Sequence, residues 1–168
     1  MAEEIIEQGY RELADTILEH NPGVDLGRVR AAFELADRAH SGQKRKAGTP
    51  YVTHCVAAAQ ICAEMGLDED SIVAALLHDC IEDTAITHED IARQFGAEVA
   101  DIVEGVTKLT RVQFTSREDE QMENLRKMLM AMAKDIRVIL IKIADRLHNM
   151  RTMEYMVAQK QLEKSLET

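Results

Sequence analysis

The sequence predicts an all-α fold, a bundle of packed helices that forms one domain. Apolar residues make up 46% of the 168 residues, but aromatic residues make up only 4% and Trp is missing. Cores built from Ala, Leu, Ile, Val and Met suit the packing of helix on helix. Two prolines and eight glycines provide too few turn signals for many short strands. A chain of this length fits one domain with a buried core.

Apolar residues of the first half recur every three or four positions, which is the period of an amphipathic helix. We expect helices over residues 3–19, 25–41, 50–66 and 68–80. Asn21-Pro22-Gly23 ends the first helix and Gly42 ends the second. Thr49 is expected to cap the third helix, with Pro50 at its first position. The fourth helix is apolar along most of its length, which is typical of a buried helix.

The second half continues the helical pattern. Thr87 opens a short helix with the spacing of a capping box, and Gly96 closes it. Asp135 is expected to cap the last helix. The expected helices after Gly96 span 97–109, 116–134 and 136–150, the last continuing or bending through 166, and a polar loop covers 110–117. We assign residues 1–158 to the domain and the polar stretch 159–168 to the start of a connection.

The charge and the cysteines restrict the class of protein. A net charge of −10 argues against a general nucleic-acid binder, although a local basic patch could still bind a small anionic ligand. The acidic N-terminus is not a secretory signal, and no apolar run reaches the roughly 18 residues of a membrane span. Cys55, Cys62 and Cys80 have no CxxC spacing, so we expect reduced thiols in the core of a cytoplasmic protein.

Ionisable residues interrupt the apolar pattern directly after the buried helix. His78-Asp79 follows Leu76-Leu77, and Glu82-Asp83 comes three residues later. Four such groups next to a core helix cost free energy unless something pairs with them. A divalent cation would do so, since imidazole and carboxylate are both good ligands for transition metals.

A second interruption occurs at Asp145, inside the last apolar helix. Lys142, Asp145, Asn149 and Thr152 follow one another at spacings of three, four and three residues, so they share one stripe of the helix. The stripe could also be a solvated face. A lone histidine such as His54 is more often a hydrogen-bonded core or surface residue than a ligand.

The order His54, then His78-Asp79, then Asp145 resembles the ligand order of HD-domain metal-dependent phosphohydrolases. The surrounding sequence is more specific, because several segments resemble the hydrolase domain of RelA/SpoT enzymes in the family's order. These segments are 42–51, 74–84, 95–96, 103–109 and 141–152. The resemblance covers roughly residues 30–160.

The resemblance implies an HD-domain helical bundle with a mononuclear metal site. One Mn²⁺ per chain would be bound by His54, His78, Asp79 and Asp145. The activity implied is removal of the 3′-pyrophosphate from ppGpp and pppGpp, which gives GDP or GTP. Glu82 and Asp83 would act beside the metal on the attacking water and its protons, and which of the two is the base stays open. The same ligands could also hold Fe²⁺, Co²⁺ or Zn²⁺.

Residues 43–48 form a short basic loop, and this loop and the polar stripe would form the nucleotide pocket. The substrate-binding residues that the resemblance implies are Lys44, Arg45, Lys46, Tyr51, Lys142, Arg146, Asn149 and Thr152. Arg45 could stack on guanine as well as bind phosphate, because a guanidinium plane does both. The sequence departs from the family at Ala47, where Ser is frequent, and at Cys55, where Pro is common.

Residues 123–138 and the polar tail resemble the long bifunctional bacterial enzymes, so we expect this chain to be the N-terminal part of one, followed by a synthetase domain.

Two other functions remain open. One is an HD phosphohydrolase acting on a dNTP, NADPH or a cyclic dinucleotide. The basic loop and the polar stripe favour the alarmones ppGpp and pppGpp instead. The other is a module that senses the alarmone without cleaving it, whose expected loss of Glu82, Asp83 or a ligand is not seen.

Overall fold

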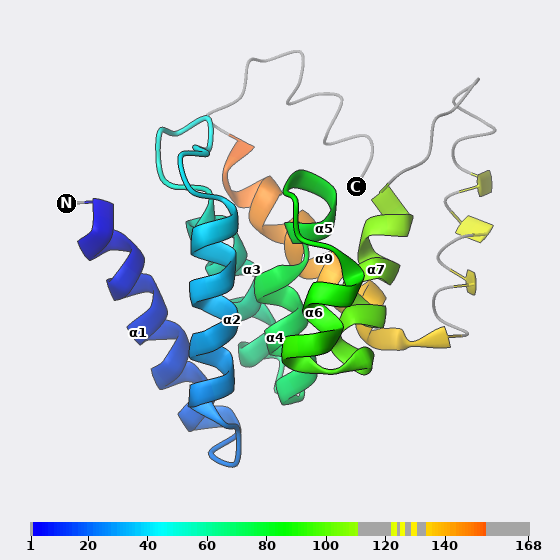
Figure 1. The fold of residues 1–168 in the computed structure, drawn as a ribbon, viewed down its shortest axis with the longest axis horizontal. Helices are drawn as coiled ribbons and strands as arrows, with labels where there is room; N and C mark the ends of the chain where they lie inside the picture. Colours follow the sequence, from blue (N-terminus) through cyan, green and yellow to red (C-terminus); the bar gives the residue numbers. More distant parts are fainter. Residues whose placement is uncertain (1, 111–121, 124, 127–128, 131–133, 154–168) are drawn as a thin grey trace.

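The computed structural model describes residues 2–110, 122–123, 125–126, 129–130 and 134–153. Figure 1 shows an arrangement of packed helices, as expected from the composition. The described residues contain no strand beyond one isolated bridge between Lys44 and Pro50. The helices with assigned bounds are α1 (Ala2–His20), α2 (Leu26–Ala39), α3 (Val52–Glu64), α4 (Glu69–Leu77), α5 (Cys80–Asp83), α6 (His88–Phe95), α7 (Ala97–Thr110) and α9 (Ile136–Arg151).

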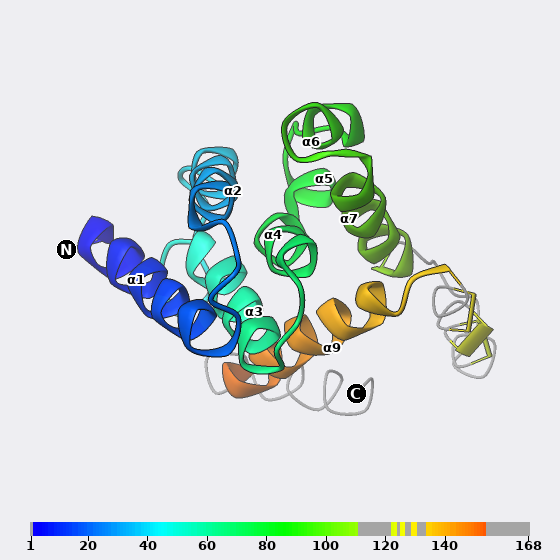
Figure 2. The same cartoon turned by 90° about the horizontal axis from the view of Figure 1, so that it is seen from below.

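Helix α4 lies at the centre of this arrangement. Figure 2 shows α1, α2 and α3 on one side of it, α5, α6 and α7 on the other, and α9 passing below it from α3 toward α7. It contacts α2, α3, α7 and α9, and every residue from 71 to 77 is buried. The predicted buried helix is therefore confirmed, because a helix that is apolar on all sides has to be surrounded by others. The helix ends at Leu77, and His78, the next residue, is buried in the interior.

The predicted helix caps are confirmed where the capping interaction is local. Asp135 accepts a hydrogen bond from Arg137 N at the start of α9, as predicted. Asp25, for which no cap was predicted, caps α2 in the same way. Thr87 and Asp90 form a reciprocal capping box on α6. Gly96 ends α6 with a φ of 96°, a conformation that favours glycine.

The predicted start of the third helix is wrong. Thr49 does not cap it, because α3 begins at Val52. Thr49 instead closes the basic loop, where its carbonyl accepts a hydrogen bond from Arg45 N at 2.9 Å. Tyr51 N donates to Gln43 O at 3.0 Å, so the residues around Pro50 pair with the first residues of the basic loop. Thr49 and Tyr51 therefore form hydrogen bonds within the loop, and the helix begins only after them.

The expected helix 68–80 is divided in two. It ends at Leu77, and the short helix α5 begins at Cys80. Asp79 has a φ of −97° and a ψ of −4°, the bridge region that often contains active-site residues. The break turns the polar residues after α4 back toward the interior.

Several predicted elements of the second half lie partly or wholly outside the described residues. Within the expected helix 116–134, residues 122–123, 125–126, 129–130 and 134 are helical. The expected loop beyond Thr110, the continuation of the last helix beyond residue 153 and the connection 159–168 lie outside the described residues. In the part of the chain that is described, no helix is long and apolar enough to cross a membrane. All three cysteines are buried and free, as predicted.

Helix α1 packs against α3 and belongs to the core. Leu13 is fully buried, whereas Leu18 on the same helix is 46% exposed. We expect Leu13→Ala to lower the free energy of unfolding by about 2–5 kcal/mol, because it removes buried methyl groups and leaves a cavity. Denaturant unfolding followed by circular dichroism measures the change.

The matched control is Leu18→Ala, which should change the free energy of unfolding by no more than about 0.5 kcal/mol. Equal effects of the two substitutions would contradict the packing of α1 against α3.

Candidate metal centre

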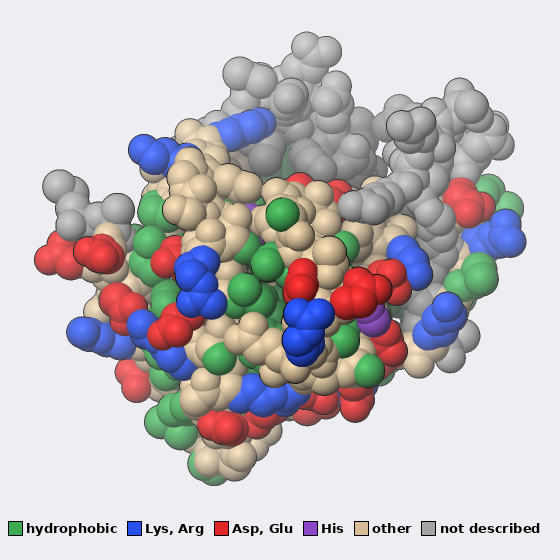
Figure 3. Space-filling model, in the orientation of Figure 1, with side chains coloured by type: hydrophobic (Ala, Val, Ile, Leu, Met, Phe, Trp, Pro, Cys, Tyr) green, Lys and Arg blue, Asp and Glu red, His purple; other side chains and the backbone are tan. Residues whose placement is uncertain are grey.

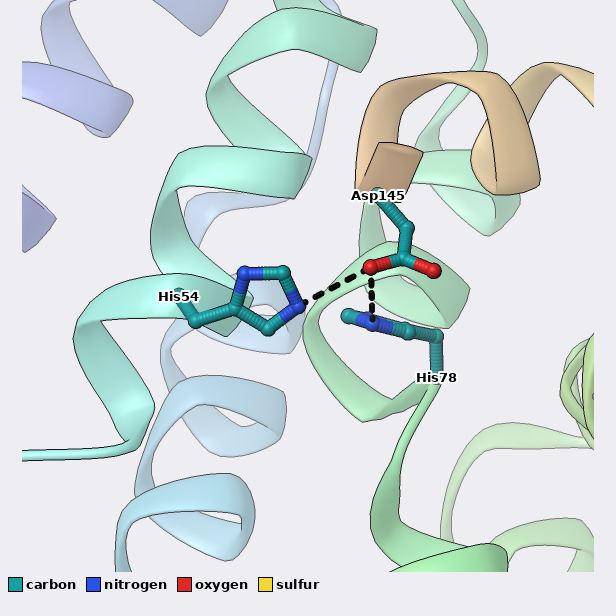
Figure 4. Close-up of side chains that lie close together, drawn as sticks. All are labelled: His54, His78 and Asp145. Carbon is teal, nitrogen blue, oxygen red and sulfur yellow. Dashed lines mark ion pairs between the residues drawn. The ribbon is translucent and has the colours of Figure 1, made fainter. Parts of the chain in front are cut away.

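Three ionisable side chains from distant parts of the sequence meet inside the bundle. His54 lies in the first turn of α3, His78 directly follows α4, and Asp145 lies in the third turn of α9. Figure 4 shows the two imidazole rings directed at the carboxylate of Asp145. All three residues are buried, and one potential ligand atom from each lies within 4.8 Å of the other two. This group could hold a metal ion.

The separations fit ligands that share one ion. Asp145 Oδ1 lies 3.2 Å from His54 Nε2 and 3.9 Å from His78 Nε2. Two ligand atoms that each lie about 2.1 Å from one ion, at tetrahedral or octahedral angles, are roughly 3.0–3.4 Å apart. The observed distances are in or slightly above this range, so a small adjustment of the side chains would bring an ion into reach of all three.

Asp79, the fourth predicted ligand, lies beside both histidines. Its Oδ2 is 3.1 Å from His78 Nε2 and 3.6 Å from His54 Nε2. The hydroxyl of Tyr51 donates a hydrogen bond to the same oxygen at 2.8 Å. The break between α4 and α5 produces this arrangement, because it turns His78 and Asp79 toward the same interior point.

The histidine rings are oriented by hydrogen bonds on the side away from the cluster. His78 Nδ1 lies 2.7 Å from the Ala75 carbonyl oxygen, which can only accept, so Nδ1 carries a hydrogen and Nε2 is the nitrogen that faces the cluster. His78 Nε2 is buried, and its 3.1 Å contact with Asp79 Oδ2 is an ion pair without hydrogen-bond geometry. A buried nitrogen without a hydrogen bond costs free energy, and a cation at this position would remove that cost. The donor set therefore fits a divalent metal.

The carboxylates and histidines of the cluster shift one another's pKa. Burial lowers the pKa of His78, but the carboxylates of Asp79 and Asp145 outweigh burial and raise this pKa to about 9. Burial also raises the pKa of the two carboxyl groups, and the neighbouring histidines overcome it, holding both pKa values well below the usual range. Burial lowers the pKa of His54. In the absence of a cation, the proton on His78 offsets part of the negative charge.

The polar stripe of α9 faces this cluster and is not a solvated face. Lys142 Nζ donates to Asp145 Oδ2 at 2.7 Å, and Asn149 Nδ2 donates to Asp145 Oδ1 at 2.7 Å. Lys142 also donates to Thr110 Oγ1 on α7 at 3.1 Å. These hydrogen bonds replace the water that a buried carboxylate loses.

The basic loop reaches the same stripe through Arg45. Its Nη2 donates to Asn149 Oδ1 at 2.8 Å and to Thr152 Oγ1 at 3.4 Å, and its guanidinium carbon lies 5.7 Å from the centre of the Tyr51 ring. Lys44 and Lys46 are exposed on the loop. Figure 3 shows basic side chains at the end of the molecule where this loop lies. The loop therefore places positive charge beside the cluster in an acidic chain.

The remaining predicted residues lie on α5 and α9. Asp83 Oδ2 is 3.3 Å from the Tyr51 hydroxyl, which also contacts Asp79, so Asp83 lies one side chain away from the cluster. Glu82 is half-buried on the same short helix, and Arg146 is half-buried directly after Asp145. Sequence reasoning missed His148, whose Nδ1 lies 2.7 Å from His54 Nδ1. Its spacing of three residues from Asp145 was the available signal.

Comparison with known proteins identifies the family of this chain. A family model for the HD domain matches residues 32–168. The bifunctional (p)ppGpp synthase/hydrolase SpoT of Escherichia coli is 51% identical over 144 residues, which are 86% of this chain and 20% of that protein. A guanosine-3′,5′-bis(diphosphate) 3′-pyrophosphohydrolase of Haemophilus influenzae is 56% identical over 119 residues, 71% of this chain and 18% of that protein. The chain thus spans about a fifth of the length of these curated relatives.

A solved structure has a similar fold. It belongs to a metazoan ortholog of SpoT that hydrolyses ppGpp, with a TM-score of 0.65 and 29% sequence identity. The alignment covers 82% of this chain and 79% of that chain. Together with the relatives, it confirms the resemblance that the sequence motifs predicted.

Binding of Zn²⁺ to the metal-free chain should release about one proton per ion near neutral pH, because the ion displaces the proton on His78. The raised pKa of His78 fixes the sign: affinity increases as the pH rises toward about 9 and levels off above it. Titration calorimetry in buffers of different ionisation enthalpy measures the number of protons released.

The control pair is Asp145→Asn and Asp101→Asn. Asp145 lies in the cluster, whereas the Asp101 side chain is 70% exposed. Only Asp145→Asn should weaken Zn²⁺ binding, since it removes a buried negative charge without changing the shape. Binding without proton release, or equal affinity in both variants, would contradict the assignment.

Proposed function

Because the chain belongs to the HD-domain family, we propose that it is a metal-dependent hydrolase that removes the 3′-pyrophosphate from ppGpp and pppGpp. The products are pyrophosphate and GDP or GTP. One observation carries the proposal: a buried group of two histidines and an aspartate lies beside a basic loop whose Arg45 reaches Asn149. A metal-binding group and a cationic surface side by side suit a substrate with two diphosphates. The named activities of the relatives point to the same substrate.

We propose one Mn²⁺ per chain, held by His54, His78, Asp79 and Asp145. Such an ion supplies two kinds of chemistry when bound: it offsets charge on phosphoryl oxygens and lowers the pKa of a coordinated water. The chain's own contribution is to fix the ligands. Ala75 O orients His78, and Lys142 and Asn149 orient the Asp145 carboxylate from two sides.

We propose that Asp83 and Glu82 orient the attacking water and accept its proton. A water oxygen forms a bond to the phosphorus attached to the 3′ oxygen, the bond from that phosphorus to the 3′ oxygen breaks, and the 3′ oxygen takes up a proton. A carboxylate outside the ligand set can accept the proton of the water. Asp83 has this position, since the Tyr51 hydroxyl lies between its carboxylate and that of Asp79. Glu82 lies on the same turn, in the half-buried part of α5.

Arg45, Asn149 and Thr152 bind the nucleotide. They are already joined by hydrogen bonds, so the guanidinium is held at the edge of the metal group before any ligand arrives. A guanidinium in a fixed orientation can bind a diphosphate or stack on a base without losing much further side-chain entropy. Lys44, Lys46, Tyr51, Lys142 and Arg146 complete the proposed set of binding residues.

The proposal extends to the whole protein. Since the relatives are about five times longer than the matched region and one is a synthase/hydrolase, we propose that a synthetase domain follows this domain in a long bacterial enzyme. Residues 1–158 would form the hydrolase domain, and 159–168 would start the linker. A cytoplasmic location is part of the same proposal.

Turnover of ppGpp tests the substrate directly. The purified chain with Mn²⁺ should release pyrophosphate from ppGpp and form GDP, whereas GDP, dGTP and NADPH should remain intact because they lack a 3′-diphosphate. Chromatography of the nucleotides and a coupled pyrophosphate assay follow both products. Stable ppGpp together with clear cleavage of one of the other nucleotides would reject the proposed substrate.

Substitution of Glu82 separates catalysis from metal binding. Glu82→Gln should keep Mn²⁺ affinity and lower kcat by about 10²–10⁴-fold, the range for loss of a general acid or base. Glu89→Gln is the control, because Glu89 is exposed on α6. Unchanged kcat in Glu82→Gln would exclude a role for this carboxylate in proton transfer and leave Asp83 as the candidate base.

A further inference from the structure

His148 contacts a predicted metal ligand from the side opposite to the metal group. It lies three residues after Asp145 on α9, so the two side chains leave the helix in neighbouring directions. His148 Nδ1 is 2.7 Å from His54 Nδ1, and the two ring centroids are 4.9 Å apart at an interplanar angle of 36°. The nitrogens thus meet nearly edge to edge, as in a hydrogen bond.

The contact allows two arrangements of hydrogen atoms. A hydrogen bond between two imidazole nitrogens contains one hydrogen, so one ring donates and the other accepts. If His148 donates, neutral His54 carries its own hydrogen on Nε2, where it points at Asp145 Oδ1 3.2 Å away. If His54 donates, its Nε2 carries a lone pair directed into the metal group. Only the second arrangement leaves His54 able to bind a cation.

We propose that His148 is a positioning residue of the metal centre: it accepts a hydrogen bond from His54 Nδ1 and so keeps the Nε2 lone pair of His54 directed at Asp145 and His78. The inference rests on the proposed metal binding, and it adds a residue that does not touch the ion. Metal-ligating histidines generally donate their second nitrogen to an acceptor that fixes the tautomer and the ring orientation.

The two histidine ligands are oriented by different kinds of acceptor. His78 uses a backbone carbonyl, that of Ala75 one helical turn earlier. His54 uses a side chain from another helix, so its orientation depends on the packing of α3 against α9. Helix α9 therefore supplies both the ligand Asp145 and the acceptor that orients the ligand opposite to it. A change in the position of α9 would alter both together.

A first test uses the unaltered chain, labelled with ¹⁵N at histidine and loaded with Zn²⁺. Scalar coupling between His54 Nδ1 and His148 Nδ1 across the hydrogen bond should be measurable, with the hydrogen bonded to the His54 nitrogen. Lack of coupling, or a hydrogen located on His148 Nδ1, would overturn the proposal without any substitution.

A second test compares His148→Asn with His148→Leu. The Oδ1 of Asn can stand near the position of the lost Nδ1 and accept the hydrogen bond, whereas Leu has a similar size and no acceptor. Zn²⁺ affinity, measured by competition with a chelator, should fall by about 10–100-fold in His148→Leu and stay close to that of the unaltered chain in His148→Asn. Equal affinities of the two variants would overturn the proposal.

The controls separate this role from folding and from the metal centre itself. His20→Leu alters an exposed histidine at the end of α1 and should leave Zn²⁺ affinity unchanged. Denaturant unfolding of each variant shows whether it folds. An unaltered chain that binds no Zn²⁺ would overturn the metal centre and His148 together, whereas binding that is equally weak in the Asn and Leu variants would overturn only the role of His148.

Discussion

The buried carboxylate of Asp145 is the group on which the rest of the site depends. Removing a carboxylate from water costs roughly several kcal/mol of free energy unless charges and hydrogen-bond donors replace the water. Lys142 and Asn149 provide two donors from α9 itself, and His54 and His78 face the carboxylate from two other parts of the chain. The packing of the bundle and the stabilisation of this single charge therefore require the same arrangement of helices.

A cluster of this composition is suited to a cation rather than to a closed set of ion pairs. The proton on His78 and the ammonium of Lys142 offset the negative charge of Asp79 and Asp145. Yet the 3.1 Å contact of His78 Nε2 with Asp79 Oδ2 lacks hydrogen-bond geometry. A divalent ion can bind the two histidine nitrogens and the carboxylates at once, whereas one proton joins only two atoms. The same physical argument explains why a metal-dependent hydrolase is the function that the geometry supports best.

Much of the fold could be predicted because it depends on local chemistry. The predicted caps of α6 and α9 use a side chain and the backbone of the next turn, so neighbouring residues are sufficient to identify them. The start of α3 and the end of α4 were predicted wrongly for the opposite reason. Thr49 pairs with Arg45 within the loop, and the chain turns at Asp79, where tertiary contacts override the helical pattern.

The sequence by itself determined which side chains are available and that burial would force them to pair, because an apolar helix that ends in His78-Asp79 cannot leave these groups in water. Only the tertiary structure decided how they pair. It directed the Asp145 stripe inward, joined Arg45 to Asn149 and set His148 against His54. These contacts span about a hundred residues of sequence. Periodicity fixes which residues share one helix face, but the relative placement of α3, α4 and α9 follows from the packing of the whole core.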